Sequence, residues 1–124
     1  MSLSKLKSEA NPGKFLPLSN AEFHILLAIA DEERHGYAIM QEVKESTQGV
    51  IRLGPGTLYR SIQELLQKGL IVESERYPAA NEDQRRRYYR MSSSGRRVLS
   101  AEARRLSEVV AIAKSKRVLR KLPT

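Results

Sequence analysis

The segment from Gly54 to Gln63 carries polar side chains that recur at helical spacing. At about 100° per residue, Thr57, Arg60 and Gln63 fall on one face of a helix, opposite an apolar face. A guanidinium can pair with guanine, a carboxamide with adenine, and a threonine with a phosphate or a thymine methyl. This face is therefore predicted to contact nucleic acid. The plainer alternative is a solvated helix face.

The start of this helix lacks side chains. Pro55 suits the first helical position because its ring fixes φ and its missing N–H would have no partner there. Gly54 and Gly56 leave room for a phosphodiester to approach the free N–H groups and the positive end of the helix dipole. Tyr59 could donate its hydroxyl to a phosphate, or it could be half buried against a strand. No Lys-Ser/Thr pair follows the glycines, so a nucleotide-binding loop is not expected.

A run of three arginines follows further along the chain. Arg85, Arg86 and Arg87 could reach a narrow minor groove or its phosphates, which would make binding steeply dependent on salt. Alternatively, Arg87 could pair with Glu73 or Glu75 across a hairpin, leaving the other two arginines for DNA.

Two helices are predicted before the Pro55 segment. Ser19 can cap the first, with Glu22 completing a capping box, and this helix is expected to end near Asp31. The second is predicted over residues 35 to about 47, and residues 50–53 are β-prone. The side chains expected to be buried by the second helix are Tyr37, Ile39 or Met40, and Val43.

A β-hairpin, or wing, is predicted after the Pro55 segment. Gly69 is expected to end the helix in the left-handed conformation. Residues 70–77 and 86–91 read as two strands, and residues 78–85 form a turn-rich loop between them. The residues of the second strand expected to point inward are Tyr89 and Met91.

The first and last helices are more apolar than a small monomer needs. Around Phe23, Leu26 and Leu27 the first helix has hardly any polar face. The last helix, capped by Ser92, is predicted to run to about Leu119 and to span roughly 40 Å, more than the body of the domain can cover. Both are expected to pack on a second copy of the chain. The apolar stripe of the last helix includes Leu99, Leu106, Val109, Val110 and Ala113.

The composition sets further limits. The 124 residues, 40% of them hydrophobic, fit one domain with a modest core. There is no cysteine, and His24 and His35 are isolated, so neither disulfides, a metal centre nor a cofactor is expected. No nucleophile or carboxylate pattern indicates an enzyme. No apolar run or signal-peptide centre occurs, so no membrane contact and a cytoplasmic location are expected.

The net charge of +8 is unevenly distributed. Residues 1–70 carry eight basic and eight acidic residues, whereas residues 71–124 carry fourteen basic and six acidic ones. This asymmetry suggests a polyanionic partner for the second part of the chain. A basic surface kept for solubility is the alternative.

Four groups of residues between positions 16 and 106 form a recognisable series. They are His35-Gly36-Tyr37, the segment from Leu53 to Arg60, Leu65-Leu66 before Lys68-Gly69-Leu70-Ile71, and Arg87 to Met91 running into Ser92-Ser93-Ser94-Gly95-Arg96. Together they resemble the PadR family of bacterial transcriptional regulators. The resemblance implies a homodimeric winged-helix repressor whose first and last helices form the dimer interface. It also implies release from the operator by a small, often aromatic, molecule.

The single C-terminal helix looks like the short subfamily, with two departures. Met91-Ser92 stands where the family usually has Leu-Thr, which keeps an apolar residue and a capping hydroxyl. The chain has no tryptophan, so the stacked-indole pocket of some short members cannot be built here.

The predicted fold is mainly α (α+β), a winged helix-turn-helix with a long C-terminal dimerisation helix. Its parts are a flexible basic N-terminal arm at 1–17, the DNA-binding domain at 18–91, and the dimerisation helix with a basic tail at 92–124. Each subunit would place the Pro55 helix in one of two successive major grooves of a pseudo-palindromic double-stranded operator. One alternative is a protein-docking or ligand-sensing module without specific DNA binding. Another is an RNA-binding protein, which would need stacking aromatics on its strands, and there only Tyr88 offers one.

Overall fold

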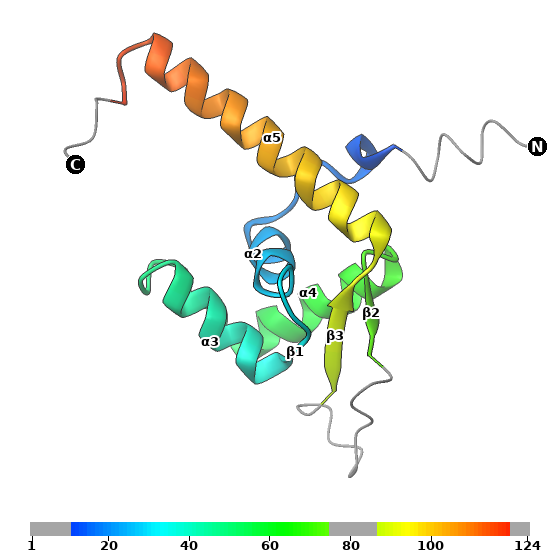
Figure 1. Cartoon of the computed structure of the whole chain (residues 1–124). Coiled ribbons are helices and arrows are strands. Elements are labelled where there is room, and N and C mark those ends of the chain that lie inside the picture. The colour runs from blue at the N-terminus through cyan, green and yellow to red at the C-terminus, as the bar shows by residue number, and fades with distance from the viewer. Residues whose placement is uncertain (1–10, 75–86, 120–124) are drawn as a thin grey trace, which may run out of the picture.

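The computed structural model describes residues 11–74 and 87–119 (Figure 1). This part of the chain is mainly helical with a small antiparallel sheet, which is the predicted winged helix-turn-helix. No helix within these two ranges has the length and apolar character to cross a membrane. In chain order the elements are η1 (Pro12–Phe15), α2 (Asn20–Ala28), β1 (Arg34–His35), α3 (Gly36–Ser46), α4 (Pro55–Gln67), β2 (Ile71–Glu73), β3 (Tyr88–Met91) and α5 (Ser93–Ser115).

The predicted helix starts are confirmed. Ser19 and Glu22 form the capping box of α2, in which each side chain accepts a hydrogen bond from the other's backbone, at 3.1 and 3.2 Å. The Ser92 hydroxyl caps α5 by accepting from the N–H of Gly95 at 3.0 Å. The Nδ1 atom of His35 accepts from the first turn of α3 at 3.1 Å. Local sequence therefore fixes where these helices begin.

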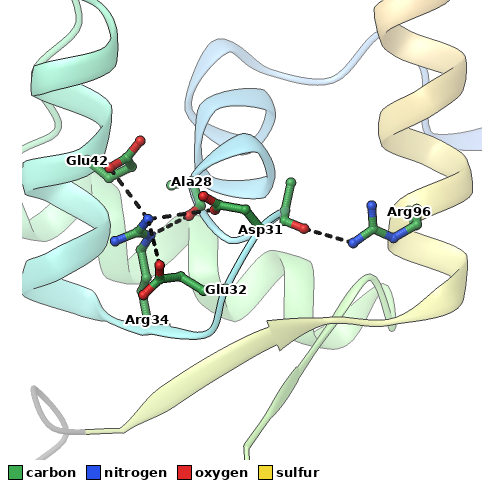
Figure 2. A network of polar contacts seen from close by, with 7 residues as sticks. Ala28, Asp31, Glu32, Arg34, Glu42 and Arg96 are labelled. Carbon is green, nitrogen blue, oxygen red and sulfur yellow. Dashed lines mark hydrogen bonds and ion pairs between the residues drawn. The ribbon is translucent and has the colours of Figure 1, made fainter.

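The end of α2 differs from the prediction, and arginines bind the carbonyl groups of its last residue and of a residue just beyond it. The helix stops at Ala28 and does not extend to Asp31. Arg34 Nε donates to the carbonyl of Ala28 at 2.6 Å, and Arg96 Nη2, on α5, donates to the carbonyl of Ala30 at 2.9 Å (Figure 2). These contacts join the end of α2 to the sheet and to α5.

Helix α3 exposes a tyrosine that was predicted to be buried. Tyr37 is 56% exposed, and its hydroxyl accepts a hydrogen bond from Gln41 at 2.7 Å. As predicted, the helix buries Ile39 and Val43, and it also buries Gly36. Tyr37 lies about 100° further around the helix than Gly36 and falls outside this buried face.

The three strands form a sheet in the order β1-β3-β2, with both pairings antiparallel. Glu73 of β2 lies opposite Tyr89 of β3. Tyr89 is buried as predicted, and Met91 is half-buried against the core. Strands β2 and β3 lie side by side at the lower right of Figure 1 and form the base of the wing.

The prediction missed one strand and placed another wrongly. Strand β1 has two residues, too few for a period-two pattern to reveal it. Residues 50–53 form no strand. There the N–H of Ile51 donates to the side-chain hydroxyl of Thr47 at 3.0 Å, and no ladder partner is needed.

A tight joint connects the end of α4 to the start of α5. Gly69 has φ of 73°, and the N–H of Leu70 donates back to the carbonyl of Leu65 at 3.0 Å, so the predicted helix stop is confirmed. The Ser92 hydroxyl donates to the carbonyl of Gly69 at 2.6 Å. A Cβ on Gly95 would collide with the carbonyl of Leu70, so the first turn of α5 can sit here only with glycine.

The core lies between α2, α3, α4, the sheet and the first half of α5. Leu26 is fully buried and Leu99 is 7% exposed, so both belong to the chain's own core and not, as predicted, to a surface for a second copy. The buried residues of α5 end at Glu102. Beyond them, α5 extends past the body (Figure 1). Its exposed apolar residues are Val109, Val110 and Ile112.

Candidate nucleic-acid interface

Helix α4 presents the predicted polar face to solvent. Leu58, Ile62 and Leu65 are fully buried and fix the rotation of the helix. Arg60 and Gln63 are consequently exposed, as are Glu64 and Gln67 further along. The predicted contact residues in and just before α4 that are exposed or half-exposed are Gly54, Pro55, Gly56, Thr57, Tyr59, Arg60 and Gln63.

The N-terminal end of α4 has no side-chain cap. Among the helices in the described residues, the others are capped by Asn11, Ser19, His35 and Ser92. At α4 the cap position is Gly54, which makes no side-chain hydrogen bond. Cβ atoms built on Gly54 and Gly56 would meet nothing within 4 Å. The free N–H groups of this end are therefore open to an outside acceptor.

Tyr59 has a packing role. It is half-buried at the edge of the core, and a Cβ on Gly36 would lie 2.5 Å from its hydroxyl oxygen. The absence of a side chain at Gly36 thus lets α3 start directly against α4. Tyr59 is therefore half buried, as one of the two alternatives predicted. That alternative placed it against a strand, whereas this contact is with Gly36 at the start of α3. A hydrogen bond from Tyr59 to a phosphate stays a prediction.

Of the three arginines predicted to contact DNA from the wing, Arg87 lies within the described residues. Arg87 Nη1 forms an ion pair with Glu73 at 2.9 Å, which is the alternative considered from the sequence. Arg85 and Arg86 lie outside the described residues, so their contact with DNA stays a prediction.

A cavity of about 310 Å³ separates the exposed face of α4 from the wing. Arg60 and Gln63 line it from α4, and Glu73, Arg87 and Tyr89 line it from the hairpin. Burial, and then the charge of Glu73, raise the pKa of Tyr89, so its hydroxyl stays neutral at physiological pH. Arg60 and Gln63 of α4 thus share one cavity with Glu73 and Arg87 of the hairpin.

Buried carboxylates hold α4 and α5 to the start of α2. Glu22 accepts a hydrogen bond from Lys68 Nζ at 2.7 Å, and Glu102 accepts from the N–H of Leu18 at 2.9 Å. Burial acts to raise the pKa of Glu22, but the hydrogen bonds from Lys68 and Ser19 outweigh it and lower the pKa. These contacts fix the orientation of α4 within the body.

Two exposed side chains in the segments before α4 were not predicted from the sequence as contact residues. Arg52 is exposed in the segment before α4 and donates from Nε to the carbonyl of Gly49 at 3.2 Å. Tyr37 is exposed at the start of α3. The position of Arg52, a charged residue just before the glycine-flanked start of α4, could have marked it as a contact residue. For Tyr37, helical periodicity predicted burial and so gave no such signal.

Comparisons with known proteins agree with this geometry. The Transcriptional regulator PadR-like family matches residues 25–101. The chain is 38% identical over 86 residues to transcriptional regulator Rv3488 of Mycobacterium tuberculosis, which covers 69% of this chain and 75% of that protein. It is also 33% identical over 85 residues to an uncharacterised protein of Lysinibacillus sphaericus, which covers 68% of this chain and 76% of that protein.

Solved structures show the same fold. A PadR family transcription regulator from Clostridium difficile superposes with a TM-score of 0.64 at 21% identity, over 77% of this chain and 95% of that one. A transcriptional regulator from Clostridium thermocellum gives 0.65 at 18% identity, over 93% and 96%. The family match and the relative from Mycobacterium tuberculosis carry the assignment further than fold. The chain belongs to the PadR-like family of transcriptional regulators, a family of DNA-binding regulators and not of enzymes.

Proposed function

We propose that the chain is a homodimeric, sequence-specific repressor that reads a pseudo-palindromic operator with α4. The observation that carries this proposal is the uncapped, glycine-flanked N-terminal end of α4, with Arg60 and Gln63 exposed beside it. A helix start without side chains can approach a phosphate closely, and the two long polar side chains can then reach base edges. The exposed apolar end of α5 supports the dimer.

The test is DNA binding by the Arg60→Ala variant. We expect affinity for the operator to fall about 10- to 100-fold, because a bidentate arginine contributes about 1–3 kcal/mol of discrimination between bases. Affinity for random DNA should fall much less. Fluorescence anisotropy with DNA from upstream of the protein's own gene, at two salt concentrations, measures both.

A matched control is Lys114→Ala, which also removes one positive charge, from an exposed position near the end of α5. It should leave the ratio of operator to random-DNA affinity unchanged. Equal losses on operator and random DNA in Arg60→Ala would contradict base reading by this residue. A wild-type protein that does not discriminate between the two DNAs would favour the docking-module alternative.

We further propose that a small aromatic molecule releases the operator, as the family resemblance implies. A cavity of about 570 Å³ lies between η1 and α5, lined in part by Pro12, Arg96, Arg97 and Ala101, and its volume suits a small ligand. The arginines in this lining would favour a carboxylate, and so an aromatic acid. Titrating aromatic carboxylates into the preformed operator complex tests this, and unchanged anisotropy across the series would count against release by this class.

A further inference from the structure

The face of the wing turned toward α4 carries a negative charge among the DNA-contacting groups. Glu73 lies opposite Tyr89 in the ladder and Arg87 precedes Tyr89 by two residues, so alternation places all three side chains on one face. Glu73 and Arg87 line the same cavity as Arg60. The Glu73 carboxylate therefore lies beside Arg60 and Arg87, the two arginines that would otherwise attract a phosphate to this cavity.

Arg87 is only partly engaged by this carboxylate. Its Nη1 donates to both oxygens of Glu73, at 2.9 and 3.1 Å. Its Nε is buried and has no hydrogen-bond acceptor among the described residues. A guanidinium binds a carboxylate or phosphate best with two parallel N–H groups, and the pairing with Glu73 uses only Nη1. The buried Nε can meet an outside acceptor only when the side chain turns away from Glu73.

The ion pair can exchange partners at small cost. The side chains of Arg87 and Glu73 are 36% and 45% exposed, and ion pairs at such exposure contribute little to stability. A DNA phosphate offers the same kind of oxygen acceptors as Glu73. It would therefore compete with Glu73 for Arg87 while being repelled by the carboxylate itself.

We propose that Glu73 is a positioning residue that holds Arg87 away from DNA in the free protein and so limits sequence-independent binding. This inference rests on the proposed function, because it concerns the same DNA-contacting surface. Binding to random DNA depends almost entirely on phosphate contacts, so a restraint on one phosphate-binding arginine acts directly on it. Loss of the restraint adds one phosphate contact.

The test is Glu73→Gln, which keeps the shape of the side chain and removes its charge. We expect affinity for random DNA to rise about 3- to 10-fold and the slope of log affinity against log salt to steepen by about one. The control is Glu108→Gln, which makes the same charge change at an exposed position on α5. A Glu73→Gln slope equal to that of the wild type, or a gain no larger than in Glu108→Gln, would overturn the inference.

A double variant tests whether Glu73 acts through Arg87. In an Arg87→Gln background, the gain from Glu73→Gln should shrink to the level of the Glu108→Gln control. If Glu73→Gln raises the affinity for random DNA by the same factor in this background as in the wild type, the inference is overturned. Glu73 would then only repel the phosphates, without acting through Arg87. If wild-type protein fails to distinguish operator from random DNA, the proposed function fails; if it does distinguish them and Glu73→Gln leaves random-DNA binding unchanged, only this inference fails.

A measurement on the wild-type protein is independent of how the variants fold. The Nε–H signal of Arg87 in a ¹⁵N-labelled sample, assigned by its loss in Arg87→Lys, reports the hydrogen bonding of this group. It should shift when random DNA is added, as Arg87 exchanges Glu73 for a phosphate. A signal that stays in place at saturating DNA would contradict the exchange.

Discussion

Gly95 and Gly56 differ in what an added Cβ atom would contact. At Gly95 a Cβ would collide with the backbone carbonyl of Leu70, so folding itself requires glycine. At Gly56 a Cβ would find nothing within 4 Å. The free protein therefore gives no reason for glycine at position 56. A reason exists if another backbone comes close to this helix end.

Gly56→Ala should therefore keep or raise stability while weakening operator binding. Alanine is favoured over glycine in a helix by up to about 1 kcal/mol, so thermal unfolding should shift to the same or a higher temperature. Operator affinity should fall about tenfold or more, because the new methyl group would separate a phosphate from the N–H groups. Thermal denaturation and anisotropy titration measure the two effects.

Gly95→Ala is the matched control for this substitution. Its Cβ must displace α5 from the Leu70 carbonyl, so we expect a loss of about 1–3 kcal/mol in the free energy of unfolding. Opposite signs of the stability change in the two variants would separate a folding glycine from a binding glycine. Full operator affinity in Gly56→Ala would show that DNA does not come close to this position.

At the scale of elements, α2 is the part that the other helices are fixed to. Lys68, at the end of α4, contacts Glu22 near the start of α2. Glu102 of α5 accepts a hydrogen bond from the N–H of Leu18, just before α2. Arg96 of α5 binds the carbonyl of Ala30 beyond its end. Helix α4 and the long helix α5 are thus held in one frame by polar contacts, two of which use the carboxylates of Glu22 and Glu102.

This frame predicts a loss of stability in acid. The hydrogen bond from Arg105 lowers the pKa of Glu102 below its ordinary value of 4.5, burial opposes this, and the N–H of Leu18 lowers it further. A carboxyl with a lowered folded-state pKa contributes stability that is fully present above about pH 4.5 and lost as pH falls through the folded-state pKa. Urea denaturation between pH 7 and pH 3 should show this loss.

Glu102→Gln should reduce that pH dependence. The amide oxygen can still accept from Leu18, but the ionisable group is gone, so the variant should be less stable at pH 7 and lose less on acidification. Glu108→Gln, at an exposed position of the same helix, should follow the wild-type curve. Parallel curves for Glu102→Gln and wild type would show that the Glu102 carboxyl does not set the acid response.

The elements that the sequence predicted well are those with local signals. The capping residues Ser19 and Ser92 and the left-handed Gly69 act on their own neighbours, so short-range patterns reveal them. Strand β1 depends on pairing with β3, and the segment after α2 on Arg96, both of which are distant in the chain. The Arg34 side chain joins β1 to the end of α2, and it also lies within 3.6 to 3.7 Å of Asp31, Glu32 and Glu42 (Figure 2). These partners of Arg34 are close in sequence, but no periodic or capping pattern marks them.

The candidate site shows the same division. The polar face of α4 follows from periodicity within one helix, so its residues could be predicted. The contact between Tyr59 and Gly36, and the burial of Leu26, depend on how the helices pack on one another. Apolar character marked Leu26 as buried but could not say whether its own chain or a partner would cover it.

At the scale of the whole molecule, α5 is longer than the body that supports it. At about 1.5 Å per residue its 23 residues span roughly 35 Å, and its buried positions end at Glu102. Past that point Val109 is 47% exposed and Ile112 is 54% exposed. Helix α5 contacts both ends of α2, and α2 in turn contacts α4. A dimer made through the apolar end of α5 would therefore set the relative positions of the two copies of α4.

Val109→Glu should separate the proposed dimer into monomers. A charge placed at the centre of a buried apolar interface is strongly unfavourable unless it is paired. Light scattering after gel filtration should therefore show a mass near twice 14.1 kDa for the wild type and near 14.1 kDa for the variant. Ala111→Glu is the control, because Ala111 is also exposed and lies about 200° around the helix from Val109.

DNA binding by the same variant distinguishes loss of the dimer from loss of the fold. A monomer keeps its own α4, so its affinity for a single half-site should be unchanged. Its affinity for the full pseudo-palindrome should fall to the half-site level, because the second half no longer binds at high effective concentration. A Val109→Glu protein that remains a dimer would contradict an interface through this part of α5. A monomer that binds the full operator as tightly as the wild type would show that dimerisation is not needed to read it.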